Sequence, residues 1–142
     1  MTIDAEIPTT STPRTRTTAA WTGMVLSTLA ILFLVMDGVM KVVKAGPVLE
    51  ASAPLEIPVW TIPIIGGILL VQTLLYAIPQ TAVLGAVLLT GYLGGATWTH
   101  LRMNGSPFEL AFPSILATFV WGGLLLREPR LRALFPWRRP SR

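Results

Sequence analysis

The stretch that decides the fold is residues 57–101, IPVWTIPIIGGILLVQTLLYAIPQTAVLGAVLLTGYLGGATWTHL, which has no Asp, Glu, Lys or Arg in 45 residues. As one α-helix it would be about 67 Å long, roughly twice the thickness of a bilayer's hydrocarbon core. The segment therefore predicts two membrane crossings. The break is expected at Pro79, because proline cannot continue the preceding helix but suits the first turn of the next one. The predicted helices are residues 59–78 and 79–100.

Two further apolar segments flank this pair, at residues 19–43 and 108–126. The second begins near Glu109, whose carboxylate favours the positive end of a helix dipole. The loop at residues 44–58 contains Gly46 and three prolines, and a short helix starting at Pro47 is expected to lie along the outer membrane interface. Trp60, Tyr76 and Trp98 fall near predicted helix ends, where an aromatic belt is expected. The predicted fold class is all-α, a four-helix transmembrane bundle at residues 19–126.

Composition narrows the classes of function. Hydrophobic residues make up 52% of the chain and charged residues only 13%, so the composition does not fit a soluble domain of this size. The net charge of +4 lies in the tails and loops, which indicates contact with lipid rather than nucleic acid. The chain has no cysteine, which excludes disulfides, Cys-ligated metal sites and thiol relays of its own. Its single histidine, His100, cannot alone supply two ligands to a haem.

The two ends of the chain differ from its centre. Residues 1–18 are rich in threonine and proline and are expected to be a disordered cytoplasmic tail. Residues 127–142 carry six arginines among apolar residues and are expected to be a basic interfacial tail that contacts anionic lipids. A cleaved signal peptide is an alternative for the N-terminal region, since Arg14 and Arg16 precede the first apolar segment. Its candidate cleavage site, residues 51–53, lies well beyond the end of an already long apolar run.

The distribution of positive charge predicts the orientation. Arg14, Arg16 and the six C-terminal arginines lie on one side of the predicted bundle, whereas only Lys41, Lys44 and Arg102 lie on the other. By the positive-inside rule, both termini are expected in the cytoplasm, with the protein in a bacterial inner membrane.

Small residues at four-residue spacing predict where the helices pack, because lipid gives helices no hydrophobic reason to associate. The alternative of a nucleotide-binding glycine loop is disfavoured, since no strand precedes these glycines. The predicted packing residues are Gly66, Gly67, Gly85, Gly91, Gly94, Gly95, Ser114, Thr118 and Gly122.

Ionisable residues near membrane depth are candidates for function. Asp37 and Lys41 lie four apart on one helical face, either as a neutralising interfacial pair or as a polar ligand or proton site. His100 ends the third helix and either caps free carbonyls or hydrogen-bonds a quinone carbonyl and passes protons. Gln72 lies mid-helix and is expected to make an interhelical hydrogen bond, with a ligand-pocket role as the alternative. Six residues are predicted to line one outward-facing polar mouth: Asp37, Lys41, Glu56, His100, Arg102 and Glu109.

The run GAVLLTGYLGGATWTHLR at residues 85–102, followed by a turn, an apolar helix and LLREPRLRALFPWRR at residues 125–139, resembles the DoxX-like family. The segment around Gly38 and Lys41 is similar as well, so the resemblance covers about residues 20–139. It implies a four-helix membrane protein. The namesake members are linked to quinone-coupled oxidation of sulfur compounds, but the absence of cysteine argues against direct thiol chemistry, and no catalytic motif carries over.

The functional expectation is a membrane subunit or accessory of a quinone-linked redox system. The sequence assigns no cofactor; a quinone is then one candidate ligand and a redox protein one candidate partner, with self-association as a further option. The alternative is a non-enzymatic membrane scaffold or a lipid-binding or transport module.

Overall fold

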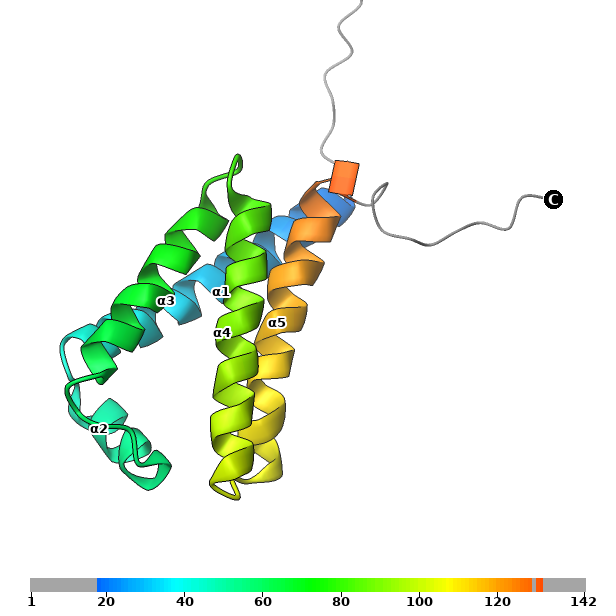
Figure 1. Cartoon of the computed structure of the whole chain (residues 1–142). Helices are drawn as coiled ribbons and strands as arrows, with labels where there is room; N and C mark the ends of the chain where they lie inside the picture. The colour runs from blue at the N-terminus through cyan, green and yellow to red at the C-terminus, as the bar shows by residue number, and fades with distance from the viewer. Residues whose placement is uncertain (1–17, 129, 132–142) are drawn as a thin grey trace, which may run out of the picture.

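The computed structural model describes residues 18–128 and 130–131, which are helical with short connections (Figure 1). Four long helices carry the fold, and two short helical segments lie between the first and second of them. The elements are α1 (Thr18–Val42), α2 (Gly46–Ser52), η1 (Ala53–Leu55), α3 (Ile62–Ala77), α4 (Ala82–Arg102) and α5 (Pro107–Arg127). The predicted tails at residues 1–18 and 127–142 lie almost wholly outside the described residues.

Three described helices, α1, α4 and α5, are long and apolar enough to cross a membrane. The helix α3 is also apolar, but it has only 16 residues. The described part of the chain is therefore all-α, as predicted, with three candidate spans and one shorter apolar helix.

The middle helices start later than predicted because turns precede them. Residues 58–61 form a turn in which both the backbone N–H and the hydroxyl of Thr61 donate to the Pro58 carbonyl. As a result α3 begins at Ile62 rather than at residue 59. Pro79 lies in the turn between α3 and α4 instead of in the first turn of α4. There the Thr81 hydroxyl donates to the Leu75 carbonyl (2.8 Å), which satisfies a free acceptor at the end of α3.

The short helix predicted to start at Pro47 is present as α2, with a proline in its first turn. It continues into η1, and Lys44 and Glu56 on either side adopt left-handed backbone conformations with φ of 53°. Figure 1 shows α2 at the same end of the molecule as the α4–α5 turn, away from the start of α1 and the end of α5.

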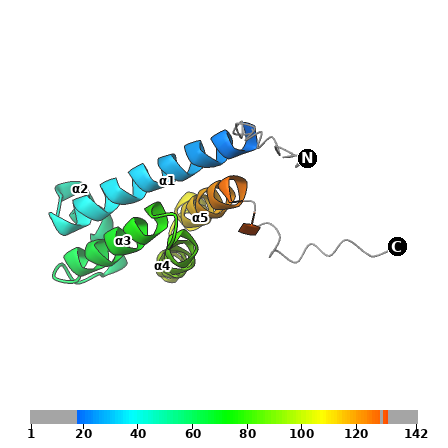
Figure 2. The ribbon, with the colours of Figure 1, turned by 90° about the horizontal axis from the view of Figure 1, so that it is seen from above.

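The four long helices pack as a ring in which α1 and α4 each contact α3 and α5. The helix α1 is inclined to the ring, so its two ends contact different helices. Near its start it packs on α5, and near its end it packs on α3. Figure 2 shows it extending from beside α3 on one side of the molecule to the end of α5 on the other.

Glycines mark the closest approaches between helices. A Cβ added at Gly123 of α5 would lie 2.5 Å from Ser27 Oγ of α1, and one added at Gly66 of α3 would lie 2.8 Å from the Gly38 carbonyl oxygen of α1. A Cβ at Gly85 of α4 would lie 2.2 Å from the backbone nitrogen of Tyr76 on α3. Side chains at these positions would force the helices apart.

The remaining predicted packing residues lie elsewhere. A Cβ at Gly122 would reach only the end of Leu26, at 4.0 Å, and Ser114 and Thr118 are exposed. Four other glycines would meet nothing within 4 Å, namely Gly67, Gly91, Gly94 and Gly95. Two of the predicted residues, Gly66 and Gly85, thus lie at tight contacts, but neither belongs to the four-residue pattern, and Gly23, Gly38 and Gly123 were overlooked.

Tyr76 of α3 lies at the end of the ring where α3 contacts both α1 and α5. It was expected in an interfacial aromatic belt, but it is 0% exposed, whereas Trp60 and Trp98 are 69% and 65% exposed. Its hydroxyl donates to the Val120 carbonyl of α5 (2.8 Å) and lies 2.9 Å from Ser27 Oγ of α1. Because a phenol has one hydrogen, the Ser27 hydroxyl must donate to the Tyr76 oxygen. Helix α3 is thereby tied to α1 and α5 by one buried side chain.

Arg127, the last residue of α5, completes this cluster. Its Nη2 donates to the backbone carbonyl of Tyr76 (3.2 Å), and its guanidinium carbon lies 5.1 Å from the centre of the Tyr76 ring. The contact satisfies a carbonyl in the last turn of α3 and adds a cation–π interaction. We call Ser27, Tyr76, Val120 and Arg127 the tyrosine cluster.

Replacing Tyr76 with phenylalanine should lower the free energy of unfolding by about 1–2 kcal/mol, because it removes two buried hydrogen bonds. Denaturation in mixed detergent micelles, followed by circular dichroism, measures the change. Tyr92→Phe is the matched control, since the Tyr92 hydroxyl has no hydrogen-bond partner among the described residues. Equal stability of the two variants would contradict the role assigned to the tyrosine cluster.

Candidate functional site

The helix pairs diverge away from the tyrosine cluster, and the space between them is a cavity of about 650 Å³. The cavity lies between the α1/α3 pair and the α4/α5 pair, and residues of α2 and η1 line it as well. Most of its lining is aliphatic or aromatic. We call it the wedge cavity; its polar lining residues are Asp37, Lys41, Ser52, Tyr92, Thr99 and His100.

The apolar wall of the cavity has two distinct kinds of surface. On α1 and α5, Phe33 and Phe112 pack edge to face, with ring centres 5.3 Å apart. On α4, Gly91 and Gly95 leave the helix surface without side chains, and a Cβ at either position would meet nothing. These two predicted packing glycines therefore face open cavity space rather than another helix.

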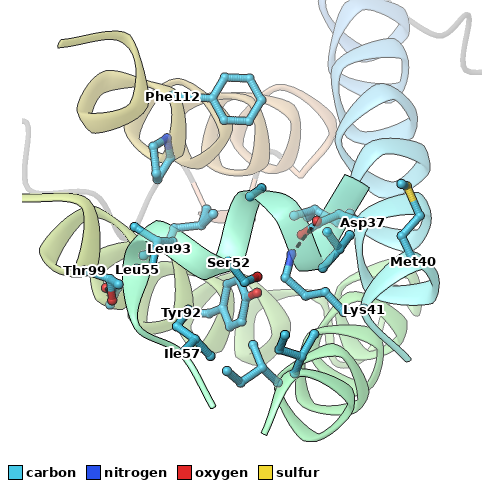
Figure 3. Close-up of a pocket in the computed structure, with 18 of the residues that line it drawn as sticks. Asp37, Met40, Lys41, Ser52, Leu55, Ile57, Tyr92, Leu93, Thr99 and Phe112 are labelled. Carbon is cyan, nitrogen blue, oxygen red and sulfur yellow. Dashed lines mark hydrogen bonds and ion pairs between the residues drawn. The ribbon is translucent and has the colours of Figure 1, made fainter. Parts of the chain in front are cut away.

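The Asp37–Lys41 ion pair forms one side of the wedge cavity. The Lys41 Nζ donates to Asp37 Oδ1 within α1, and both side chains are partly buried (Figure 3). An ammonium group has three donors, so Lys41 keeps donors for a further acceptor. The structure thus shows the predicted pair and also places it against a cavity.

Two hydroxyl groups add to this polar side. Figure 3 shows Ser52 of α2, Tyr92 of α4 and Lys41 of α1 extending into the same space. Neither the Ser52 nor the Tyr92 hydroxyl has a hydrogen-bond partner within residues 18–128 and 130–131. A cavity lined by unpartnered donors on an apolar background is typical of a site for an amphipathic ligand.

His100 lies at the end of α4, and backbone groups do the capping there. The Gly105 N–H donates to the His100 carbonyl (2.8 Å) and the Asn104 N–H donates to the Leu101 carbonyl (3.3 Å). Asn104 has φ of 52°, so the helix ends in a Schellman motif. The imidazole takes no part in it, and its buried Nδ1 has no hydrogen-bond partner in the described part of the chain. His100 is therefore available to a ligand of the wedge cavity.

Glu56 and Arg102 line a second, smaller cavity of about 120 Å³ together with Trp98. The two cavities are neighbours, because Leu55 and Thr99 line both. The six residues predicted to form one mouth are therefore divided, with Asp37, Lys41 and His100 around the larger cavity and Glu56 and Arg102 around the smaller one.

Glu109, the sixth residue, lines neither cavity. Its N–H donates to Ser106 Oγ (3.4 Å), and its Oε2 accepts from the Ser106 N–H (2.6 Å). This capping box starts α5 and accounts for a carboxylate at that position. Gln72 lines neither cavity either, and its buried Oε1 lacks the hydrogen bond expected of it among the described residues.

Sequence reasoning missed Tyr92 and Ser52. A tyrosine far from either helix end was the available signal for Tyr92, because a buried phenol needs a hydrogen-bond partner. Ser52 carried no such signal, since its position depends on how the α2 segment folds back over the long helices.

In the residues that the structure describes, no group of three or more acidic or histidine side chains could hold a metal ion.

The apolar helices and the amphipathic cavity define the class as a small multi-pass membrane protein. The sequence profile of the DoxX-like family matches residues 25–123, well over half of the chain. The chain belongs to the DoxX-like family, as its sequence suggested. No curated protein and no solved structure is detectably similar to it.

A cysteine at Ser52 should report whether the wedge cavity is open. Ser52 is only 8% exposed, yet it lines the cavity, so Ser52→Cys should react with a small methanethiosulfonate reagent. Ser27→Cys is the matched control, since Ser27 is 1% exposed and lies in the tyrosine cluster. The chain has no native cysteine, so mass spectrometry reads each label directly. Equally slow labelling of both variants would show that the cavity is closed.

Proposed function

We propose that α1, α3, α4 and α5 each cross a bacterial inner membrane and that both termini are cytoplasmic. The excess of arginine in the two tails over the basic residues of the α1–α3 and α4–α5 connections supports this orientation. The helix α3 spans only about 24 Å, but the uncharged residues 57–61 precede it and lengthen the apolar segment. A local thinning of the bilayer accommodates the remaining difference between the length of this apolar segment and the thickness of the hydrocarbon core.

Reporter fusions after positions 50, 79, 105 and 142 should read outside, inside, outside and inside. Alkaline phosphatase and green fluorescent protein, which are active on opposite sides of the membrane, give the two readings. If α3 does not cross, the fusions at 79 and 105 exchange sides and the two termini separate. That result would contradict the four-crossing arrangement.

The wedge cavity is a binding site for a quinone, and the protein serves a quinone-linked redox system as a membrane subunit or accessory. The observation that carries this proposal is the set of unpartnered polar groups on an otherwise apolar cavity wall. Tyr92 and Ser52 have hydroxyl donors, and Lys41 has spare ammonium donors. A quinone presents two carbonyl acceptors on an apolar ring and tail, which matches both features of the cavity.

The glycine-lined face of α4 suits a flat ring. Gly91 and Gly95 let a ligand approach the helix backbone, while Phe33 of α1 and Phe112 of α5 offer apolar contact elsewhere on the cavity wall. The chain has no cysteine and only one histidine, so a partner protein must supply any iron–sulfur, haem or flavin centre that exchanges electrons with the quinone. The chain's own part is to bind and orient the quinone and to exchange protons through His100.

The test of the site measures the binding of a short-chain quinone to the protein in nanodiscs through the quenching of tryptophan fluorescence. Tyr92→Phe should weaken binding about three- to tenfold, the effect of one lost hydrogen bond. Gly95→Leu should weaken it at least as much by filling the cavity. Gly94→Leu is the matched control, because Gly94 is equally unobstructed but does not line the cavity.

Redox coupling has a separate test. In native membranes, His100→Gln and Asp37→Asn should lower quinone-linked activity, and a flavoprotein or another redox protein should co-purify with the chain in mild detergent. Unchanged activity in both variants would remove the chemical basis of the redox role. Retention of phospholipid with no quinone binding would instead support the alternative of a non-enzymatic lipid-binding module.

A further inference from the structure

The smaller cavity combines opposite charges from two separate elements. Glu56 follows η1 and Arg102 ends α4, and both side chains line a space of about 120 Å³ together with Trp98, Thr99, Leu55 and Met103. The space equals about four water molecules by volume, so it suits a small polar group. It lies at the end of the molecule away from the tyrosine cluster, next to the α4–α5 turn.

Both charged side chains are exposed at the surface of the protein. Within the described residues, the side chains of Glu56 and Arg102 form no hydrogen bond or ion pair, either with each other or with a third group. A ligand that carries both complementary charges matches an anion and a cation on the wall of one cavity, and the exposure of both residues leaves them accessible to it. Such a ligand has an anionic oxygen group for the Arg102 guanidinium and a hydrogen-bonding ammonium for the Glu56 carboxylate.

We infer that the smaller cavity binds the zwitterionic headgroup of an aminophospholipid, with its phosphate at Arg102 and its primary ammonium at Glu56. The lining residue Trp98 supports a lipid source, because its indole is 65% exposed, as in side chains that anchor at the membrane interface. The neighbouring Leu101 is also exposed, so acyl chains can lie along the outside of α4. Since Leu55 and Thr99 line both cavities, a bound headgroup also lies next to the wedge cavity.

The inference is independent of the quinone proposal. Native mass spectrometry of the full chain, exposed to equal amounts of phosphatidylethanolamine, phosphatidylcholine and phosphatidylglycerol with identical acyl chains, measures it. Phosphatidylethanolamine should be retained about tenfold more than phosphatidylcholine, because a quaternary ammonium cannot donate a hydrogen bond to Glu56. Phosphatidylglycerol should bind least at this site, because it has no cation to face the carboxylate.

Substitutions at the two charges should have different effects. Glu56→Gln should bring the preference for phosphatidylethanolamine over phosphatidylcholine close to one, whereas Arg102→Gln should weaken retention of all three lipids. Glu50→Gln and Lys44→Gln are the matched controls, since both residues are exposed on the same connection and line neither cavity. Melting curves of each variant exclude a loss of folding.

Three outcomes would overturn the inference: an unchanged lipid preference in Glu56→Gln, an equal loss in the control variants, or a preference for phosphatidylglycerol. Competition by free phosphoethanolamine separates the two sources of the same chemistry. If the free headgroup displaces the lipid completely at millimolar concentration, the ligand is a soluble zwitterion rather than a membrane lipid. Quinone binding that persists in Glu56→Gln shows that the two cavities act separately.

Discussion

The hydroxyl of Tyr76 joins three helices at one point, since it donates to the Val120 carbonyl of α5 and accepts from Ser27 of α1. Helix association in lipid depends on such hydrogen bonds and on close backbone approach rather than on burial of apolar surface. Both join the two helix pairs at this end of the ring, where Gly85 and Gly123 let neighbouring helices approach, whereas the close approach of Gly38 to Gly66 lies within the α1/α3 pair. The helices are therefore fixed at one end, and the diagonal course of α1 makes the two pairs diverge toward the other (Figures 1 and 2).

This divergence gives the protein a cavity. The open end is lined partly by α2 and η1, which contribute Ser52 and Leu55 to the cavity wall. Groups that would be costly to bury in lipid, the Asp37–Lys41 pair and the imidazole of His100, lie against this space instead. Because these polar side chains line the cavity, they are also available to a ligand in it.

The two cavities differ in the chemistry they favour. The wedge cavity combines apolar walls with hydrogen-bond donors, a set that fits carbonyl acceptors on a hydrophobic body. The smaller cavity presents a carboxylate and a guanidinium with little apolar surface, a set that fits a zwitterion. The proposed ligand inside the bundle and the proposed lipid headgroup at its rim are thus compatible.

The sequence alone determined the all-α class, the number and order of the apolar helices, the short helix at Pro47 and the family. These follow from local properties: the length of uncharged runs, the stereochemistry of proline and the spacing of small residues. It also identified most of the charged residues near the cavities, because ionisable groups are rare in membrane segments. Only the tertiary structure decided that Gly91 and Gly95 line a cavity while Gly23 and Gly123 touch, that Tyr76 is buried, and that Tyr92 and Ser52 share a site. The physical reason is that these outcomes depend on the crossing angles of the helices and on how α2 folds back, which are set by contacts between residues far apart in the chain.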